Sequence, residues 1–206
     1  MSFSTPDLFK TALRVLVYMG QTMDMGITYS RFAPNAGELE WWTDSDWAMR
    51  RSTTGGTGQL AGGSVCAQSR RQDCVTGSST HAEAVAASSN SNDAMWSRGL
   101  CDELGWAPVG PTPMKVDAQN VLTITHDFVS SKQTRHIARR ELIVREREVE
   151  GHIRLDKVPS EDNLADMFTK ALDRLPFEKL RKGVMNILAS GVWFLAPRGK
   201  RSRAVT

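Results

Sequence analysis

Apolar positions at helical spacing mark the first element of the chain. From Pro6 to Met19 they recur at a spacing that places them on one face of a helix, at Leu8, Leu13, Leu16 and Val17. This spacing predicts a short amphipathic helix, with Thr5 as its N-cap and proline at its first position. We expect Gly20 to end the helix and residues 33–37 to form a turn or linker before the main domain.

Three strands are predicted next. Residues 38–44 mix alternation with two tryptophans, which favours a strand that ends near Asp44. Two weaker strands are expected at residues 56–60 and 64–68, and the Gly62–Gly63 pair between them is typical of a tight turn. The sequence therefore predicts that the domain begins with antiparallel hairpins.

A longer helical pattern follows, from Ser79 to Leu104, and Gly105 ends it. Its middle, residues 88–93, is rich in serine and asparagine, which predicts a locally weak helix. The later elements alternate, as strand 113–117, a short helix around 121–124, a charged helix 134–150, strand 152–158 and a helix from Ser160 through Leu172. This order is typical of a mixed α/β domain.

Bulk composition excludes some classes of protein. Of 206 residues, 40% are hydrophobic and 24% charged, as in globular proteins. There is no apolar run of membrane-spanning length and no signal peptide, so we expect an intracellular protein without a membrane partner. Three cysteines without CxxC spacing argue against a disulfide framework or a structural zinc site.

Charge distribution is more informative than the net charge of +3. No acidic residue occurs between Asp46 and Asp73, while that span contains Arg50, Arg51, Arg70 and Arg71. Further basic clusters follow at 132–140 and 198–203. Each cluster alone is typical of a solvated face, whereas together they fit a surface that follows a phosphate backbone.

Four acids stand at chemically suggestive positions, with Asp44 and Asp117 at the ends of predicted strands, Glu83 in the first turn of a predicted helix and Asp166 in the last helix of the domain. Strand ends and helix starts meet at one edge of an α/β sheet, and a few carboxylates suffice to hold Mg²⁺. Two such ions, roughly 3.5–4 Å apart, support phosphoryl displacement. Because clustered carboxylates repel one another, we expect the metal itself to assemble part of the site.

Spacing alone leaves alternatives to these four residues. The chain has 23 acidic residues, most of them necessarily solvated, so any single acid is more often a surface group than a ligand. Asp46 fits either a ligand or a turn residue, and we favour the turn. His81 and Glu83 match half of a zinc deaminase signature, but the PCxxC half is absent, which excludes that class. The tryptophans fit base stacking or, by default, core packing.

A resemblance to a known family changes this balance. It is carried by six segments in order, namely residues 43–47, 51–55, 78–83, 116–119, 135–137 and 160–170, of which Ser160-Glu-Asp-Asn-Leu-Ala-Asp-Met-Phe-Thr-Lys170 is the most specific. These segments resemble the ribonuclease H domain of copia-type retrotransposon Pol polyproteins, over about residues 8–188. The resemblance implies a ribonuclease H-like mixed five-stranded sheet in β-β-β-α-β-α-β-α order, flanked by helices. It also implies a division into residues 1–36, resembling the connection after reverse transcriptase, residues 37–174 as the ribonuclease H-like domain, and residues 175–206 as a closing helix with a basic tail.

The resemblance further implies an activity. The family hydrolyses the RNA strand of RNA–DNA hybrids with Mg²⁺ or Mn²⁺, so two ions are expected on the carboxylates that match its ligands, Asp44, Glu83, Asp117 and Asp166. We expect contacts with the hybrid from Arg51, Gln119, Arg135 and His136. The reverse transcriptase portion of the same polyprotein is an expected partner. The expected location is the cytoplasm, in a virus-like particle, or the nucleus.

The chain also departs from the family pattern. The loop after Asp44 is shorter than usual, and several common residues are replaced, at Gly56 (for tyrosine), His81 (for glutamate), Ala84 (for tyrosine), Ala118 (for asparagine) and Ala138 (for aspartate). Losses around a metal site weaken affinity or activity by about 10–100-fold each. The second hypothesis is therefore a decayed or co-opted remnant that binds nucleic acid without cutting it.

Overall fold

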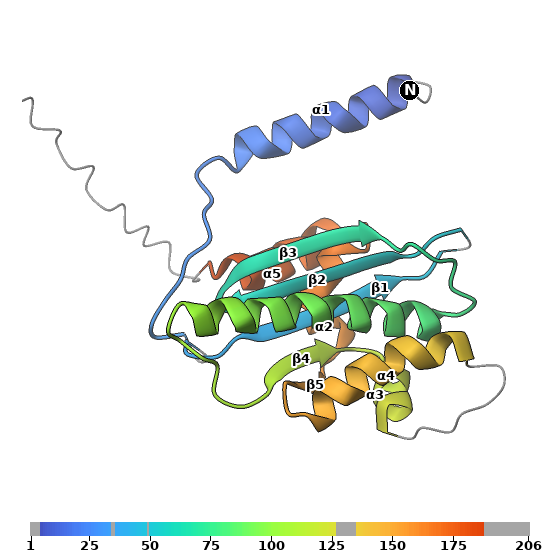
Figure 1. Cartoon of the computed structure of the whole chain (residues 1–206). Helices are drawn as coiled ribbons and strands as arrows, with labels where there is room; N and C mark the ends of the chain where they lie inside the picture. Colours follow the sequence, from blue (N-terminus) through green and yellow to red (C-terminus); the bar gives the residue numbers. More distant parts are fainter. Residues whose placement is uncertain (1–4, 34–35, 49, 127–134, 188–206) are drawn as a thin grey trace, which may run out of the picture.

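A central mixed sheet organises the chain (Figure 1). The computed structural model describes residues 5–33, 36–48, 50–126 and 135–187, and side chains outside 123–141. The strands are β1 (Glu40–Asp46), β2 (Thr53–Leu60), β3 (Gly63–Arg71), β4 (Thr112–Val116) and β5 (Ile153–Lys157), in the spatial order β3-β2-β1-β4-β5. The first three are antiparallel, while β4 is parallel to β1 and β5 to β4. The expected ribonuclease H-like five-stranded sheet is confirmed.

Helices cover both faces of this sheet. One face carries α2 (Ser79–Glu103), α3 (Gln119–His126) and α4 (Arg135–Val149), and the other carries α5 (Arg174–Met185) (Figure 1). Successive strand residues point to opposite faces. Trp41 accordingly packs with Met114 and Val144 under α2 and α4, whereas Trp42 packs with Leu164 and Leu180 on the α5 side. Trp41 is thus a core residue.

The polar middle of α2 is continuous helix, contrary to the predicted local weakness. Ser88, Asn90 and Ser91 are buried there and have partners that offset their low helix propensity. The Ser91 hydroxyl donates to the Ser88 carbonyl (2.8 Å) and accepts from Arg147 of α4 (2.5 Å). Tertiary hydrogen bonds therefore stabilise a segment whose composition disfavours helix.

The turn between β2 and β3 lies one residue before the predicted Gly62–Gly63 pair. Leu60 pairs with Gly63, and the two central residues, Ala61 and Gly62, have φ of 53° and 82°. A two-residue turn with positive φ at both positions matches the twist of a hairpin. The prediction was wrong because alanine rarely adopts this conformation, so the sequence favoured the two glycines.

The helix predicted from Ser160 through Leu172 is also corrected. Two short 3₁₀ helices occur instead, η2 (Ser160–Asp162) and η3 (Leu164–Phe168), separated by Asn163. The buried Asn163 side chain accepts from the Ala165 N–H (3.1 Å) and donates to the Thr43 carbonyl of β1 (3.1 Å). This bond to the sheet interrupts the helix, and Asn163 replaces Ser160 as the cap of η3.

The N-terminal helix, α1 (Pro6–Gln21), stands apart from the sheet (Figure 1). Thr5 caps it as predicted, since its hydroxyl accepts from the Leu8 N–H (3.3 Å), but the helix continues one residue past Gly20. No α1 residue is buried. Among the described residues, no helix combines the length and apolarity that crossing a bilayer requires.

Candidate metal centre

Three carboxylates converge where two neighbouring strands end. Asp44 lies near the end of β1, Asp117 directly follows β4, and Asp166 lies in η3. One oxygen from each lies within 4.8 Å of the other two. Because β1 and β4 are parallel neighbours, their carboxyl ends meet at the same edge of the sheet. The structure thus brings together three of the four predicted ligands.

The fourth predicted ligand, Glu83, lies near the start of α2 and outside this group of three. Burial is the main reason that its pKa rises to about 8, and the charges of Asp44 and Asp117 act in the same direction. Contacts with Ser45 partly offset both effects. Glu83 is therefore close enough to the cluster for the charges of Asp44 and Asp117 to raise its pKa.

Asp44 is the most buried of these acids, with a side chain 1% exposed. Burial raises its pKa to about 6, and the charges of Asp166 and Asp117 add to that effect. Burial likewise raises the pKa of Asp166. Desolvated carboxylates that repel one another favour their protonated forms, and a bound cation reverses this preference.

The segment that contains Asp166 is held against the sheet by contacts with two strands, β3 and β2. Ser69 of β3 donates to the Phe168 carbonyl (2.6 Å). Gly55, which pairs with Asp44 across β1 and β2, leaves room for η3, because a Cβ there would lie 2.5 Å from Thr169 Cγ2 and 2.9 Å from the Ala165 carbonyl oxygen. Close backbone approach thus requires glycine at this position.

Two residues just after η3 contact the carboxylates and were not predicted as site residues. The Thr169 hydroxyl donates to Asp44 Oδ2. Lys170 Nζ lies 2.9 Å from Asp166 Oδ1 and 3.4 Å from both carboxylate oxygens of Asp44. Both residues belong to the most specific segment of the family resemblance, which was the only signal in the sequence. Ser160, at the start of that segment, donates to Asp117 Oδ2 (2.8 Å).

Asn90, a buried residue of α2, explains why the chain has glycine at position 56, where the family commonly has tyrosine. The Asn90 amide donates to Thr43 Oγ1 (2.7 Å) and the Gly55 carbonyl (3.0 Å), and its Oδ1 accepts from Trp41 Nε1 (3.1 Å). A Cβ on Gly56 would lie 1.8 Å from Asn90 Oδ1. The space next to residue 56 is therefore filled by Asn90, which excludes a side chain there.

The residues expected to contact a nucleic acid lie on several separate elements, unlike the three carboxylates. Arg51 is exposed between β1 and β2, and Gln119 begins α3, where its Oε1 accepts from Lys157 Nζ (2.9 Å). The side chains of Arg135 and His136, at the start of α4, lie outside the described residues. Asp46, the last residue of β1, is exposed and is not part of the group of three carboxylates.

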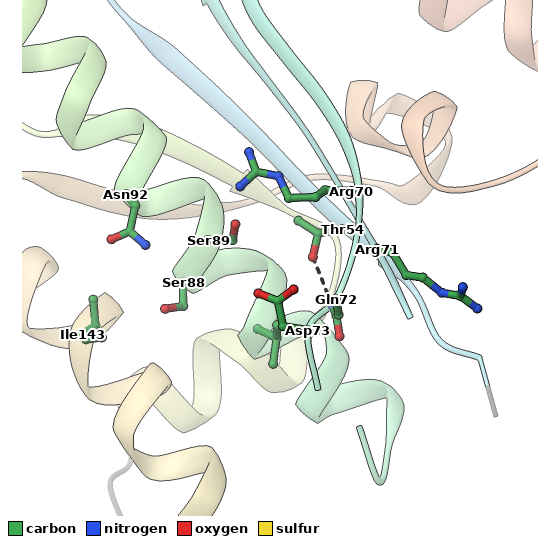
Figure 2. A pocket seen from close by; sticks show the side chains of 10 residues that line it. Thr54, Arg70, Arg71, Gln72, Asp73, Ser88, Ser89, Asn92 and Ile143 are labelled. Carbon is green, nitrogen blue, oxygen red and sulfur yellow. Dashed lines mark hydrogen bonds between the residues drawn. The ribbon is translucent and has the colours of Figure 1, made fainter. Parts of the chain in front are cut away.

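A separate cavity of about 400 Å³ lies between the end of β3, α2 and α4 (Figure 2). None of the four acids lines it. Arg70 and Asp73 contribute opposite charges, and the buried Gln72 side chain donates to Thr54 Oγ1 (3.1 Å) and the Ala82 carbonyl (2.9 Å). Its mixed charge and lack of clustered acids distinguish this cavity from the metal centre.

Comparison with known proteins identifies relatives along most of the chain. It is 31% identical over 144 residues (68% of the chain) to the retrovirus-related Pol polyprotein from transposon TNT 1-94 of Nicotiana tabacum, and 29% identical over 188 residues (89%) to that from transposon RE2 of Arabidopsis thaliana. The aligned parts are 11% and 13% of those much longer polyproteins.

No protein-family model matches the chain. Among solved structures, ribonuclease H1 of Halobacterium salinarum superposes with a TM-score of 0.48 at 15% identity, covering 64% of this chain and 94% of that one. The sequence relatives are Pol polyproteins of plant transposons, as the family resemblance predicted, and the sheet has the five strands that it implied. The chain is thus similar to a part of the Pol polyproteins of plant copia-type retrotransposons, and its mixed five-stranded sheet agrees with a ribonuclease H-like domain.

Proposed function

We propose that the carboxylate cluster hydrolyses the RNA strand of an RNA–DNA hybrid, as part of a retrotransposon Pol polyprotein. The observation that carries this proposal is the convergence of Asp44, Asp117 and Asp166 to within 4.8 Å at one sheet edge. All three offer oxygen, the donor that Mg²⁺ and Mn²⁺ prefer, and no sulfur or imidazole joins them in the described part of the chain. The donor set therefore fits a hard divalent cation.

Each residue has a distinct role in this proposal. Asp44, Asp117 and Asp166 hold the ions, and Glu83 completes the ligand set from the side of α2. Two divalent ions bound there supply the activation of water and the stabilisation of the leaving oxygen. Thr169 orients the Asp44 carboxylate through its hydroxyl. Ser160 does the same for Asp117.

The hybrid would be recognised by shape and by its 2′-hydroxyl groups rather than by base sequence. We assign contacts with its backbone to Arg51, Gln119, Arg135 and His136. We propose residues 1–36 as the connection to reverse transcriptase, 37–174 as the nuclease domain and 175–206 as a closing helix with a basic tail. The proposed location is that of the retroelement, in cytoplasmic virus-like particles or the nucleus.

Cleavage of a labelled RNA–DNA hybrid in Mg²⁺ tests the activity. We expect the intact chain to cut the RNA strand only, and Asp44→Asn to lower the rate by at least about 100-fold, the upper end of what even indirect changes at metal sites cost. Asp162→Asn is the matched control, because Asp162 is exposed and pairs with Lys179 away from the cluster. No cleavage by the intact chain, or equal cleavage by Asp44→Asn, contradicts the proposal.

Two binding measurements distinguish the remnant hypothesis from an active nuclease. A remnant binds the hybrid equally in EDTA and in Mg²⁺ and shows no detectable Mg²⁺ affinity. An active nuclease shows Mg²⁺ binding that Asp44→Asn and Asp166→Asn each weaken. Electrophoretic mobility shifts and calorimetric Mg²⁺ titration measure these two quantities.

A further inference from the structure

Lys170 places a positive charge inside the carboxylate cluster. Its Nζ pairs with Asp166 (2.9 Å) and with Asp44 (3.4 Å), and the Asp44 side chain is 1% exposed. Exposed ion pairs contribute little because water screens them, whereas a buried carboxylate has few other sources of compensation. The Lys170 side chain is itself 37% exposed, but one of the carboxylates that it pairs with is buried.

The backbone fixes where this ammonium goes. The Lys170 and Thr169 N–H groups both donate to the Asp166 carbonyl (3.0 and 3.2 Å), which closes a turn directly after η3. The Thr169 hydroxyl oxygen also lies 3.2 Å from that carbonyl oxygen. Residues 166–170 thus present a carboxylate, a hydroxyl and an ammonium group to Asp44 as one unit, which is anchored to the sheet by the Ser69 hydrogen bond to Phe168.

The charge balance shows what the ammonium does. Asp44, Asp117 and Asp166 lie within 4.8 Å of one another, so in their ionised forms they repel. From the sequence we expected a metal ion to assemble part of the site, and the chain also supplies a cation of its own. A divalent ion that binds the same oxygens meets this positive charge and competes with it for Asp44 and Asp166.

We propose that Lys170 is a built-in counter-cation, which holds the carboxylate cluster together without metal and is exchanged for a divalent ion when one binds. The proposal rests on the proposed metal site but not on cleavage. It predicts opposite effects of removing the charge: the metal-free protein loses stability, while the site gains affinity for Mg²⁺. A lysine with a purely structural role would lower stability with and without Mg²⁺ and would leave the affinity unchanged or weaker.

Lys170→Met, measured without RNA, tests the exchange. We expect its melting temperature in EDTA to fall well below that of the wild type, and saturating Mg²⁺ to restore most of the difference. In calorimetric titration the Mg²⁺ affinity should rise by roughly tenfold, the lower end of the effect that one charge within ~4–6 Å has on a carboxylate's proton affinity. Lys170→Arg keeps the charge and should behave like the wild type in EDTA.

Lys179→Met is the matched control. Lys179 also pairs with an aspartate, Asp162 (2.6 Å), but both side chains are about half exposed. It should change neither the response of the melting temperature to Mg²⁺ nor the Mg²⁺ affinity. Equal destabilisation of Lys170→Met in EDTA and Mg²⁺, or unchanged or weaker Mg²⁺ binding, overturns the proposal. If Lys170→Met lowers the melting temperature in EDTA and raises the Mg²⁺ affinity, while the wild type cuts no hybrid, the counter-cation proposal is supported and the nuclease proposal fails.

Discussion

Asn90 connects α2 to the strand that carries Asp44 and to the neighbouring strand β2. The Asn90 side chain is fully buried in α2, and its amide and carbonyl groups contact three positions of β1 and β2, at Trp41, Thr43 and Gly55. Thr43 directly precedes Asp44. A polar side chain at the centre of a helix is thus satisfied by the strand that positions the most buried acid.

Replacing this asparagine should be costly. Asn90→Ala leaves Trp41 Nε1 without its buried partner and creates a cavity, so we expect a loss of about 2–4 kcal/mol in the free energy of unfolding. Asn92→Ala is the comparison, because Asn92 is exposed on the same helix and such changes typically stay within about 0.5 kcal/mol. Urea denaturation of both variants measures the difference, and equal losses would show that the buried network contributes nothing special.

The acids of the site make stability depend on pH. The folded protein raises the pKa of Asp44 from 3.8 to about 6 and that of Glu83 from 4.5 to about 8. A raised carboxyl pKa stabilises the fold at low pH, and this contribution is lost as the pH rises through the folded value. In EDTA we therefore expect the melting temperature to fall between about pH 4 and pH 8.

Glu83→Gln and Mg²⁺ should each weaken this dependence. The variant has no carboxyl group at position 83, so its melting temperature should change less between pH 6.5 and 8.5. Bound Mg²⁺ compensates the ionised carboxylates, so its stabilising effect should grow with pH. Glu103→Gln, at the exposed end of α2, is the control. Thermal melts across this range that are parallel for the wild type and Glu83→Gln would rule out Glu83 as a source.

At the level of elements, the site depends on how closely η3 lies against β2. Gly55 provides the contact, and a side chain there would overlap the segment that holds Asp166 and Lys170. The acid of η3 and the acid of β1 are therefore coupled through a backbone contact as well as through charge.

Gly55→Ala should move Asp166, which lies in η3, away from Asp44, which lies in β1. Its Cβ meets Thr169 Cγ2 at 2.5 Å, so η3 must shift, at a typical overpacking cost of about 1–3 kcal/mol. We expect Mg²⁺ to stabilise this variant much less than the wild type in thermal melts. Gly77→Ala is the control, because a Cβ at Gly77 meets nothing within 4 Å. Full Mg²⁺ stabilisation of Gly55→Ala would mean that the contact does not position the ligand.

Elements and acids differ in how far the sequence could predict them. Alternation located β1, whose two tryptophans face opposite cores, and helical periodicity located α2. Asp44 and Asp117 were expected at strand ends, but the family resemblance rather than their spacing identified them as ligands. The 3₁₀ helices could not be predicted, since Asn163 interrupts the helix through a bond to Thr43, 120 residues earlier. Lys170 was missed for the same reason: its partner Asp44 is 126 residues away in sequence.

At the scale of the whole molecule, α1 is the least attached element. Its contacts with the rest are made near its end, where Tyr18 packs edge-on against Phe177 of α5 (5.9 Å between ring centroids) and accepts a hydrogen bond from Arg181 (3.1 Å). The residues just after α1 are held more firmly, because the Thr28 N–H donates to the Met185 carbonyl (2.9 Å) and Tyr29 donates to the Ser64 carbonyl (2.7 Å).

Removing α1 should therefore leave the sheet intact. We expect a chain lacking residues 1–21 to melt within a few degrees of the full chain, since no α1 residue is buried and a change of about 1 kcal/mol shifts melting by about 2–4 °C in domains of this size. Removing residues 1–30 deletes the bonds of Thr28 and Tyr29 and should lower melting further. Similar melting of the two truncated chains would show that residues 22–30 do not support the sheet.

The late position of η3 in the sequence has a consequence for synthesis. Asp44 and Asp117 emerge from the ribosome well before Asp166 and Lys170, which close the cluster from the far side of the sheet. A nascent polypeptide that stops short of residue 166 has the strands but lacks both the last ligand and the internal cation. The proposed metal centre is therefore completed only after all five strands of the sheet have been made.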